Sequence, residues 1–271
     1  MSKIWFITGT SRGFGRRFVE AALSRGDKVA ATARNTASLA DLVAAHGNAI
    51  LPLSLDVTDK SAVNAAVKQA HEHFGRLDVV VNNAGYGVFG TIEELTEENV
   101  RALFDTNVFG ALWVTQAALP FMRAQGSGHI IMLSSLLGVA AFPTTGAYSA
   151  SKAAIEGIAD SLAQEVAAYG IKVSIIEPGP FGTDFAASSV YSEPLAAYKE
   201  LHEAVNASFA TMPVADPGIV GPELLKVIDA DKPPLRIFFG PLAAQVVPHV
   251  YAERLKTWDA WAHVGTGVAA S

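Results

Sequence analysis

The sequence predicts an α/β fold: a single-domain, Rossmann-type, doubly wound parallel sheet of about seven strands flanked by helices. Two observations predict it. Short, continuously apolar segments alternate with longer helical patterns, and several of the helical patterns end at a glycine. Continuous apolar strands are typical of parallel sheets buried on both faces, and parallel neighbours need right-handed crossovers. No linker, internal repeat or low-complexity stretch interrupts the pattern, so residues 1–271 are expected to form one domain.

The expected elements follow one another in a regular order. Strands are expected at 3–8, 28–33, within 49–57, and at 77–85, 129–135, 172–179 and 235–240. Helices are expected at 13–26, 36–47, 60–75, over most of 96–124, at 145–169 and near 194–207. Glycine is a common residue at the C-terminal end of a helix, which supports several of these boundaries. Residues 184–215 are expected to form a substrate lid, and 241–271 a C-terminal helix and tail.

Composition excludes several classes of function. The chain of 271 residues has no cysteine and a formal net charge of −6. We therefore expect no disulfide framework and no thiolate metal site, and an intracellular, cytoplasmic location. The chain has no basic run and no long apolar segment, and its first residues are not expected to be a signal peptide, so neither nucleic acid nor a membrane is an expected partner. The HEH triplet at 71–73 and His129 do not form a metal-ligand pattern, and no metal is expected.

A glycine-rich turn follows the first expected strand. The segment TGTSRGFG (8–15) lies between a strand and a helix. Glycine allows positive φ, and its lack of a side chain lets the backbone approach a pyrophosphate at the start of the helix. A ligand-free turn is the alternative interpretation. The expected phosphate-binding residues are Gly9, Ser11, Arg12, Gly13, Phe14 and Gly15.

The end of the second strand indicates which dinucleotide binds. NAD-binding proteins of this type carry an acidic residue about 20 positions after the glycine turn. No acidic residue occurs between Lys28 and Ala40; Arg34 lies there instead, and Arg12 lies within the turn. Two guanidinium groups match the 2′-phosphate of NADP(H), which is the cofactor that we predict. The alternative is that both arginines are simply solvated.

The segment YSASK (148–152) places a tyrosine one helical turn before a lysine. Tyr148 and Lys152 lie on one helix face, where an ammonium group lowers the pKa of a neighbouring phenol. Bringing a pKa of about 10 down to about 7 needs roughly 4 kcal/mol, more than one lysine is expected to supply. A second positive charge, such as that of an oxidised nicotinamide ring, is therefore part of the hypothesis.

These segments together resemble the short-chain dehydrogenase/reductase family, in its ketone- and alcohol-acting branch. The resemblance rests on TGTSRGFG, NNAG (82–85), Asn107, Ser135 and YSASK, and it extends over residues 3–185. It implies that Tyr148 is the proton donor and acceptor and that Lys152 lowers its pKa and binds the nicotinamide ribose. It further implies that Ser135 holds the substrate oxygen, while Asn107 holds a water against the lysine.

The same resemblance assigns further cofactor contacts. Asp56 is expected to bind the adenine amino group, although a turn or helix-capping role is the alternative, and Val57 follows it. Asn83, Ala84 and Gly85 are expected on the adenosine side. The loop after the sixth strand is expected to contact the nicotinamide through Pro178, Gly179, Phe181 and Thr183.

The substrate is expected to be a hydrophobic ketone or secondary alcohol. Leu136, Phe142 and Phe185 offer apolar surface, together with Ser135 and Tyr148, and the lid contains no arginine for an anionic substrate. The alternatives are the same chemistry with NAD(H), or a cofactor-binding redox sensor without turnover. A sensor is expected to have lost Tyr148, Lys152 or Ser135, and this chain retains all three. Small residues on helices 98–122 and 145–169, together with the resemblance, predict a homodimer or homotetramer.

Overall fold

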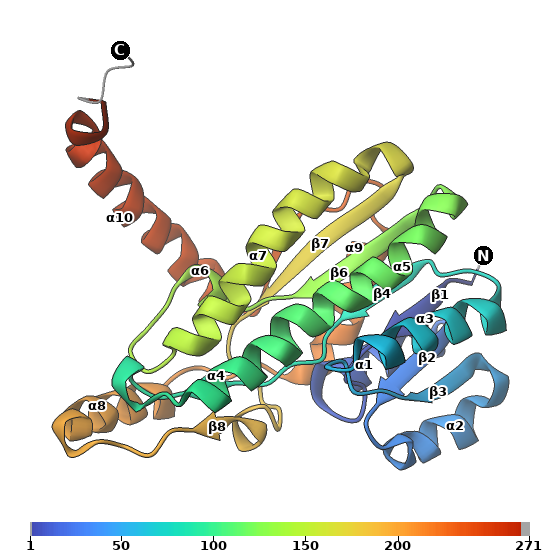
Figure 1. Ribbon diagram of the computed structural model, residues 1–271, viewed down its shortest axis with the longest axis horizontal. Coiled ribbons are helices and arrows are strands. Elements are labelled where there is room, and N and C mark those ends of the chain that lie inside the picture. Colours follow the sequence, from blue (N-terminus) through green and yellow to red (C-terminus); the bar gives the residue numbers. More distant parts are fainter. Residues whose placement is uncertain (1, 267–271) are drawn as a thin grey trace.

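A computed structural model describes residues 2–266 of the chain and shows one layered α/β unit (Figure 1). Seven parallel strands form the main sheet in the order β3-β2-β1-β4-β6-β7-β9. Their bounds are β1 Ile4–Ile7, β2 Lys28–Ala33, β3 Ile50–Ser54, β4 Val79–Asn82, β6 Gly128–Leu133, β7 Ile171–Pro178 and β9 Arg236–Phe239. The expected doubly wound sheet of about seven strands is confirmed.

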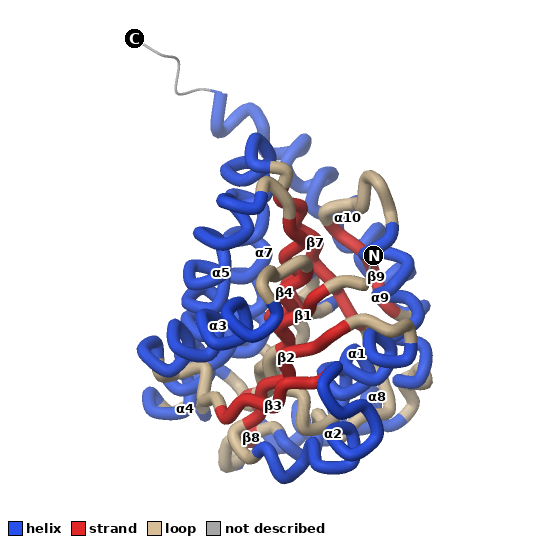
Figure 2. Tube along the Cα trace, turned by 90° about the vertical axis from the view of Figure 1, so that its right-hand side faces the viewer, coloured by secondary structure: helices blue, strands red, loops and turns tan. Residues whose placement is uncertain are grey.

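Helices cover both faces of the sheet (Figure 2). One face carries α3 (Lys60–Phe74), α5 (Ala111–Gln125) and α7 (Gly146–Val166), and the other carries α1 (Gly13–Ser24), α2 (Ala40–His46) and α9 (Val220–Asp229). The remaining helices are α4 (Glu97–Phe104), α6 (Leu136–Val139), α8 (Lys199–Ala210) and α10 (Pro241–Thr266). A π-helical turn, Asp105–Gly110, joins α4 to α5.

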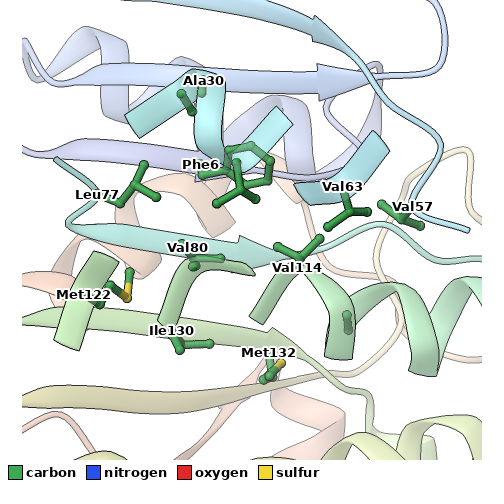
Figure 3. Packing of buried hydrophobic residues seen from close by; sticks show 14 of the residues in the cluster. Phe6, Ala30, Val57, Val63, Leu77, Val80, Val114, Met122, Ile130 and Met132 are labelled. Carbon is green, nitrogen blue, oxygen red and sulfur yellow. The ribbon is translucent and has the colours of Figure 1, made fainter. Parts of the chain in front are cut away.

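Alternate residues of each strand supply two separate cores, because side chains on a strand point to opposite faces. On β1, Phe6 packs with Val80 and Ile130 beneath α3 and α5, as Figure 3 shows. Trp5 and Ile7 pack on the opposite face, beneath α1 and α9. This burial on both faces explains why the strands read as continuous apolar runs.

Three features differ from the sequence-based expectation. A small parallel ribbon pairs β5 (Val88–Phe89) with β8 (Val190–Tyr191), and neither strand was predicted. Helix α9 was also not predicted, and the helix expected near 194–207 is α8, which begins and ends later. Two-residue strands are too short to produce a periodic pattern, so tertiary contacts alone define them.

The C-terminal helix α10 projects from the body of the protein (Figure 1). Its first turns pack against α6 through Ala243 and Val247, whereas Trp258 and Trp261 are exposed. The predicted tail beyond residue 266 lies outside the described residues. Among the described residues, no helix combines the length and the apolar character needed to cross a bilayer.

The sheet order reverses at β1, which pairs with β2 on one side and with β4 on the other. In open α/β sheets a ligand crevice forms where the order reverses, at the carboxyl ends of the strands. The glycine turn follows β1 and the NNAG segment follows β4, so both lie at this crevice.

Candidate active site and cofactor crevice

The glycine turn between β1 and α1 is held against the end of β4 by side-chain hydrogen bonds. The Asn83 amide donates to the backbone carbonyls of Thr8 and Gly9 at 2.8 and 3.0 Å. The Thr8 hydroxyl accepts from the backbone N–H groups of Asn83 and Ala84, both at 3.0 Å. The structure thus brings the predicted residues of the two segments together, and Asn83 acts here as a clamp on the turn.

The turn has no room for side chains at two of its glycines. Gly9 has φ +68°, and a Cβ atom there would lie 2.9 Å from the Cα atom of Ala84. A Cβ atom on Gly15 would lie 2.5 Å from the Asn83 Nδ2 atom. The bare backbone is followed by the first turn of α1, whose N–H groups have no acceptors within the helix and which contains no acidic residue. An anionic pyrophosphate fits this cradle.

Two exposed arginines lie close in sequence to the glycine turn and to the end of β2. The Thr10 backbone N–H and hydroxyl both donate to the Thr32 carbonyl at 3.0 Å, which joins the glycine turn to the end of β2. Arg12 precedes α1 and Arg34 follows β2; both are exposed, and neither side chain has a hydrogen bond or ion pair within residues 2–266. Nearby Arg16, by contrast, contacts Glu20 and Asp41. Arg12 and Arg34 are therefore the cations available to a 2′-phosphate.

One carboxylate oxygen of Asp56 stabilises a turn, which was the alternative interpretation of this residue. Its Oδ1 atom accepts from the Thr58 N–H at 3.0 Å and from the Thr58 hydroxyl at 2.8 Å. The N-terminal cap of α3 is Asp59, not Asp56. Val57 is buried, and a Cβ atom on Gly110 would meet its side chain. The Oδ2 atom of Asp56 is the acceptor left for an adenine amino group.

Tyr148, Lys152 and Ser135 converge beside the carboxyl ends of β6 and β7. Tyr148 and Lys152 lie one turn apart on α7, both buried, with Nζ 5.7 Å from the centroid of the phenol ring. Lys152 Nζ donates to the Leu133 carbonyl at 2.7 Å. Ser135 caps α6 and accepts the Leu137 N–H at 3.1 Å, so its hydroxyl proton is free to be donated.

Burial has the largest effect on the pKa values of Tyr148 and Lys152. Burial raises the pKa of the Tyr148 phenol well above its ordinary value, against a smaller lowering by the Ser135 hydroxyl. Burial also lowers the pKa of Lys152 to about 8, while Glu156 acts in the opposite direction. The expected lowering of the Tyr148 pKa by Lys152 is not among the influences on the phenol in this structure, where burial has the largest effect.

Asn107 lies on the π-helical turn and uses its whole side chain for structure. Its Oδ1 accepts the Tyr86 N–H at 3.0 Å, and its Nδ2 donates to the Tyr86 carbonyl at 2.9 Å and to the Ser151 hydroxyl at 3.1 Å. These bonds join the NNAG segment to α7. A π-helical turn interrupts the regular backbone ladder and is frequent at functional sites. The Asn107 amide is thus committed to Tyr86 and Ser151, and the water contact implied by the resemblance stays a prediction.

The loop after β7 closes the other end of the crevice. The Gly179 N–H donates to the Phe239 carbonyl at 2.9 Å, and the Thr183 N–H donates to the Phe181 carbonyl at 2.8 Å. The Phe181 ring meets the Phe14 ring edge-on, with centroids 5.0 Å apart. Phe14 and Phe181 therefore join the glycine turn to the loop that carries Pro178 and Thr183.

Aromatic rings surround the phenol of Tyr148. The ring centroids of Phe89 and Phe185 lie 5.7 and 5.5 Å from that of Tyr148, and Tyr191 lies 5.6 Å from Phe89. Phe89 and Tyr191 face one another on the unpredicted ribbon. Phe89 was missed by the sequence analysis; its position shortly after NNAG was the available signal.

The other expected substrate residues lie apart from this cluster. Leu136 is buried and packs with Ala243 and Val247 of α10. Phe142 is 40% exposed, and its backbone N–H donates to the Thr145 hydroxyl. Phe185 is thus the one of the three expected apolar residues that contacts the Tyr148 ring.

Segment 184–215, the expected lid, is bound by a buried carboxylate that the sequence analysis also missed. Glu94 accepts the Leu195 N–H at 2.9 Å, and His202 Nε2 of α8 lies 2.8 Å from Glu94 Oε1. Burial raises the pKa of Glu94, but hydrogen bonds from the Leu195 backbone, His202 and Thr91 outweigh it and bring the pKa to about 2. The Glu94 side chain is therefore ionised. It binds Leu195, which precedes α8, and His202, which lies near the start of α8.

The histidines noted in the sequence have other partners. The His71 ring stacks on Phe121 with centroids 4.2 Å apart. His129 is buried, and its Nε2 lies 3.0 Å from the Ser174 hydroxyl; burial lowers its pKa to about 3. Within residues 2–266 no group of three or more His, Cys, Asp and Glu residues is placed to hold a metal ion.

Comparison with known proteins identifies the family of this chain. The family model for short chain dehydrogenases matches residues 3–194, and the chain belongs to the short-chain dehydrogenase/reductase family. It is 42% identical to oxidoreductase BOA17 of Botryotinia fuckeliana, over 90% of this chain and 91% of that protein. It is 34% identical to a 3-ketodihydrosphingosine reductase of Bacteroides thetaiotaomicron, over 94% and 93% of the two chains. The protein is therefore an oxidoreductase of this family.

Solved structures share the fold. A short-chain dehydrogenase from Streptomyces avermitilis is 39% identical, with a TM-score of 0.94 and full coverage of both chains. A short-chain dehydrogenase from Burkholderia cenocepacia in complex with NADP is 25% identical, with a TM-score of 0.76 over 95% and 96% of the chains. One from Burkholderia phymatum in complex with NAD is 24% identical, with a TM-score of 0.81 over 94% and 95%. The second of these structures holds NADP and the third holds NAD, and all three share the fold of this chain.

Proposed function

We propose that the protein is an NADP(H)-dependent oxidoreductase that interconverts ketones and secondary alcohols with apolar substituents, and that Tyr148 is its acid/base. The observation that carries the proposal is the convergence of three groups: the buried Tyr148 phenol, the Ser135 hydroxyl that acts on it, and the Lys152 ammonium. They lie at the edge of a crevice whose other end has a bare glycine turn.

The residues of the chain have complementary tasks in this chemistry. When bound, a nicotinamide cofactor supplies or accepts the hydride. Reduction of a ketone leaves negative charge on its oxygen, to which Tyr148 gives a proton and Ser135 donates a hydrogen bond. One N–H of the Lys152 ammonium donates to the Leu133 carbonyl. Two N–H groups are left, for a ribose hydroxyl and for a water on the way to solvent.

The preference for NADP(H) rests on Arg12 and Arg34. Both guanidinium groups are exposed at the adenosine end and have no acidic partner within the described residues. A 2′-phosphate pairs with such groups through charge-assisted hydrogen bonds, whereas an unmodified ribose leaves them in solvent. Gly9 and Gly15 would admit the pyrophosphate, and Thr183 with Gly179 would border the nicotinamide.

The apolar substrate class rests on the rings around Tyr148. Phe89, Phe185 and Tyr191 line the approach to the phenol, and the described lid segment 184–215 contains no arginine. The similarity to a 3-ketodihydrosphingosine reductase makes a ketone on a long alkyl chain a reasonable first substrate to test.

The function is tested by following oxidation of NADPH and NADH with a panel of ketones. The panel includes small aliphatic ketones, aryl ketones, 3-ketodihydrosphingosine and a keto acid. We expect turnover with NADPH on apolar ketones and little on the keto acid. Cofactor binding without turnover on any ketone, or on the secondary alcohols in reverse, would contradict the proposal and favour a sensor.

We further propose a homo-oligomer that uses the helical face formed by α5 and α7. The Phe109 ring on the π-helical turn before α5 is exposed and stacks on Trp113, which offers apolar surface next to small residues. Sedimentation analysis is expected to give a dimer or tetramer, and Phe109→Glu is expected to shift it toward the monomer. A monomeric wild-type protein would contradict this.

A further inference from the structure

A layer of buried charged groups lies beneath α7, behind the lysine of the candidate active site. Glu156 is one helical turn after Lys152, and Glu177 is near the end of β7. Arg236 begins β9 and is aligned with Ile175 of β7. Arg236 is paired with Ile175, so their side chains point to the same face of the sheet. Glu177 lies two residues after Ile175 on β7 and points to that face too. Glu177 and Arg236 therefore both face α7.

The Arg236 guanidinium contacts three carboxylates in this layer. Arg236 Nε lies 3.0 Å from Glu156 Oε2 and 3.6 Å from Glu177 Oε1, and its two terminal nitrogens bind Asp160. Asp160 is half-exposed, whereas the side chains of Glu156 and Glu177 are 11% and 1% exposed. The charged groups that act on Glu177 are Glu156 of α7 and Arg236 of β9, and Glu156 in turn acts on Lys152.

The hydrogen-bonding capacity of this layer is not filled. Within residues 2–266, both carboxylate oxygens of Glu177 and the Oε1 atom of Glu156 are buried without a hydrogen-bond partner. An ionised carboxylate buried without donors is costly, and two neighbouring carboxylates resist simultaneous ionisation. A proton bound by the Glu156 and Glu177 carboxylates removes one negative charge and provides one hydrogen-bond donor.

Electrostatics agree with this geometry. Burial raises the pKa of Glu177 to about 7, with Glu156 adding to the increase and Arg236 opposing it. Burial also raises the pKa of Glu156, against the Ser134 hydroxyl and Arg236, which lower it. The pair is therefore expected to hold one proton, mainly on Glu177, whose side chain is the more deeply buried of the two.

We propose that Glu156 and Glu177 share one proton near neutral pH, and that the remaining negative charge, on the Glu156 side, keeps the buried Lys152 ammonium protonated. Glu156 and Glu177 are then positioning residues that act on the reaction through Lys152. This inference rests on the proposed function for its catalytic consequence, but the proton sharing is a property of the chain alone.

The direct test is a carbon-13 NMR titration of the full-length protein labelled at Glu Cδ and Lys Cε. The resonances are assigned with Glu177→Gln, Glu156→Gln and Lys152→Arg, and Glu165→Gln, an exposed position on α7, is the matched control. We expect a Glu177 carboxyl that titrates near pH 7. We also expect Glu156→Gln to lower the midpoint of Lys152 by about one pH unit, the order expected for a partly buried neighbouring charge. The control is expected to leave Lys152 unchanged.

A second readout does not depend on assignment or on activity. A carboxyl group whose pKa is raised on folding makes the free energy of unfolding fall as pH rises from about 4.5 to about 7. Glu177→Gln removes this dependence, so its urea midpoint is expected to vary less across that range than that of the wild type. With NADPH and a ketone substrate, Glu156→Gln is expected to move the alkaline limb of kcat downward by a similar shift.

The outcomes separate the inference from the proposed function. A Glu177 carboxyl that titrates near 4, or a Lys152 midpoint unmoved by Glu156→Gln, overturns the inference even if ketones are reduced. Absence of turnover on every ketone overturns the proposed function, while the NMR and unfolding titrations still decide whether the pair shares a proton. If Glu156→Gln does not fold, the Lys152 midpoint is measured in Glu156→Asp instead, together with the titration of Glu177 in the wild-type protein.

Discussion

Gly15 lies so close to Asn83 that a Cβ atom at position 15 would be 2.5 Å from the Asn83 Nδ2 atom. The same Asn83 amide binds the carbonyls of Thr8 and Gly9. One side chain from the end of β4 thus sets the shape of the turn after β1, and the bare backbone at Gly15 is a requirement of that clamp.

Gly15→Ala is expected to weaken NADP(H) binding at least tenfold, about 1.4 kcal/mol. The added methyl group must displace the Asn83 amide or the Gly9 carbonyl, and both shape the anion cradle. Gly157→Ala on α7 is the matched control, because a Cβ atom there meets nothing within 4 Å. The control is expected to stabilise the protein by up to about 1 kcal/mol and to leave the dissociation constant unchanged. Tight binding in Gly15→Ala would show that the pyrophosphate lies elsewhere.

Arg34→Asp is expected to shift the ratio of kcat/KM for NADPH over NADH toward NADH by tenfold or more. The change removes a cation from the 2′-phosphate position and places an acceptor near the ribose hydroxyls. Lys232→Asp makes the same charge change at an exposed, remote position and should leave the ratio as it is. An unchanged ratio in Arg34→Asp would remove the basis for NADP(H) over NAD(H).

The lid is expected to loosen in acid because Glu94 fastens it as a carboxylate. The pKa of Glu94 is about 2 in the folded protein, below its ordinary value of 4.5, so its stabilisation is complete above pH 4.5 and is lost as pH falls toward 2. Hydrogen exchange at the Leu195 amide should quicken over that interval. Glu94→Gln should quicken it at neutral pH, whereas Glu98→Gln, at an exposed position, should not. Equal protection in the two variants would contradict a fastening role.

Sequence reasoning identifies the parts of this fold whose signals are local. The strands buried on both faces and the glycine turn are examples, because apolar runs and a strand–glycine–helix order carry the signal themselves. The resemblance supplied the roles of Ser135 and Asn107. The side chain of Asn107, however, is committed to Tyr86 and Ser151, which only the structure shows.

Other parts depend on contacts between distant segments. Phe89 reaches Tyr148 because β5 pairs with β8 about a hundred residues later, and two-residue strands leave no period in the sequence. Glu94 binds His202 across a similar separation. The direction of the Tyr148 pKa in the protein also depends on burial, which the spacing of YSASK does not specify.

The most direct test of the central claim is Tyr148→Phe, measured for both binding and turnover. The substitution removes one oxygen from a buried ring and keeps its packing against Phe89 and Phe185. NADPH binding, followed by cofactor fluorescence, should stay within about threefold of the wild type. Turnover of ketones should fall by about 10² to 10⁴, the usual contribution of a positioned acid/base. Turnover close to the wild-type rate with binding intact would contradict the account, because another group would then be supplying the proton.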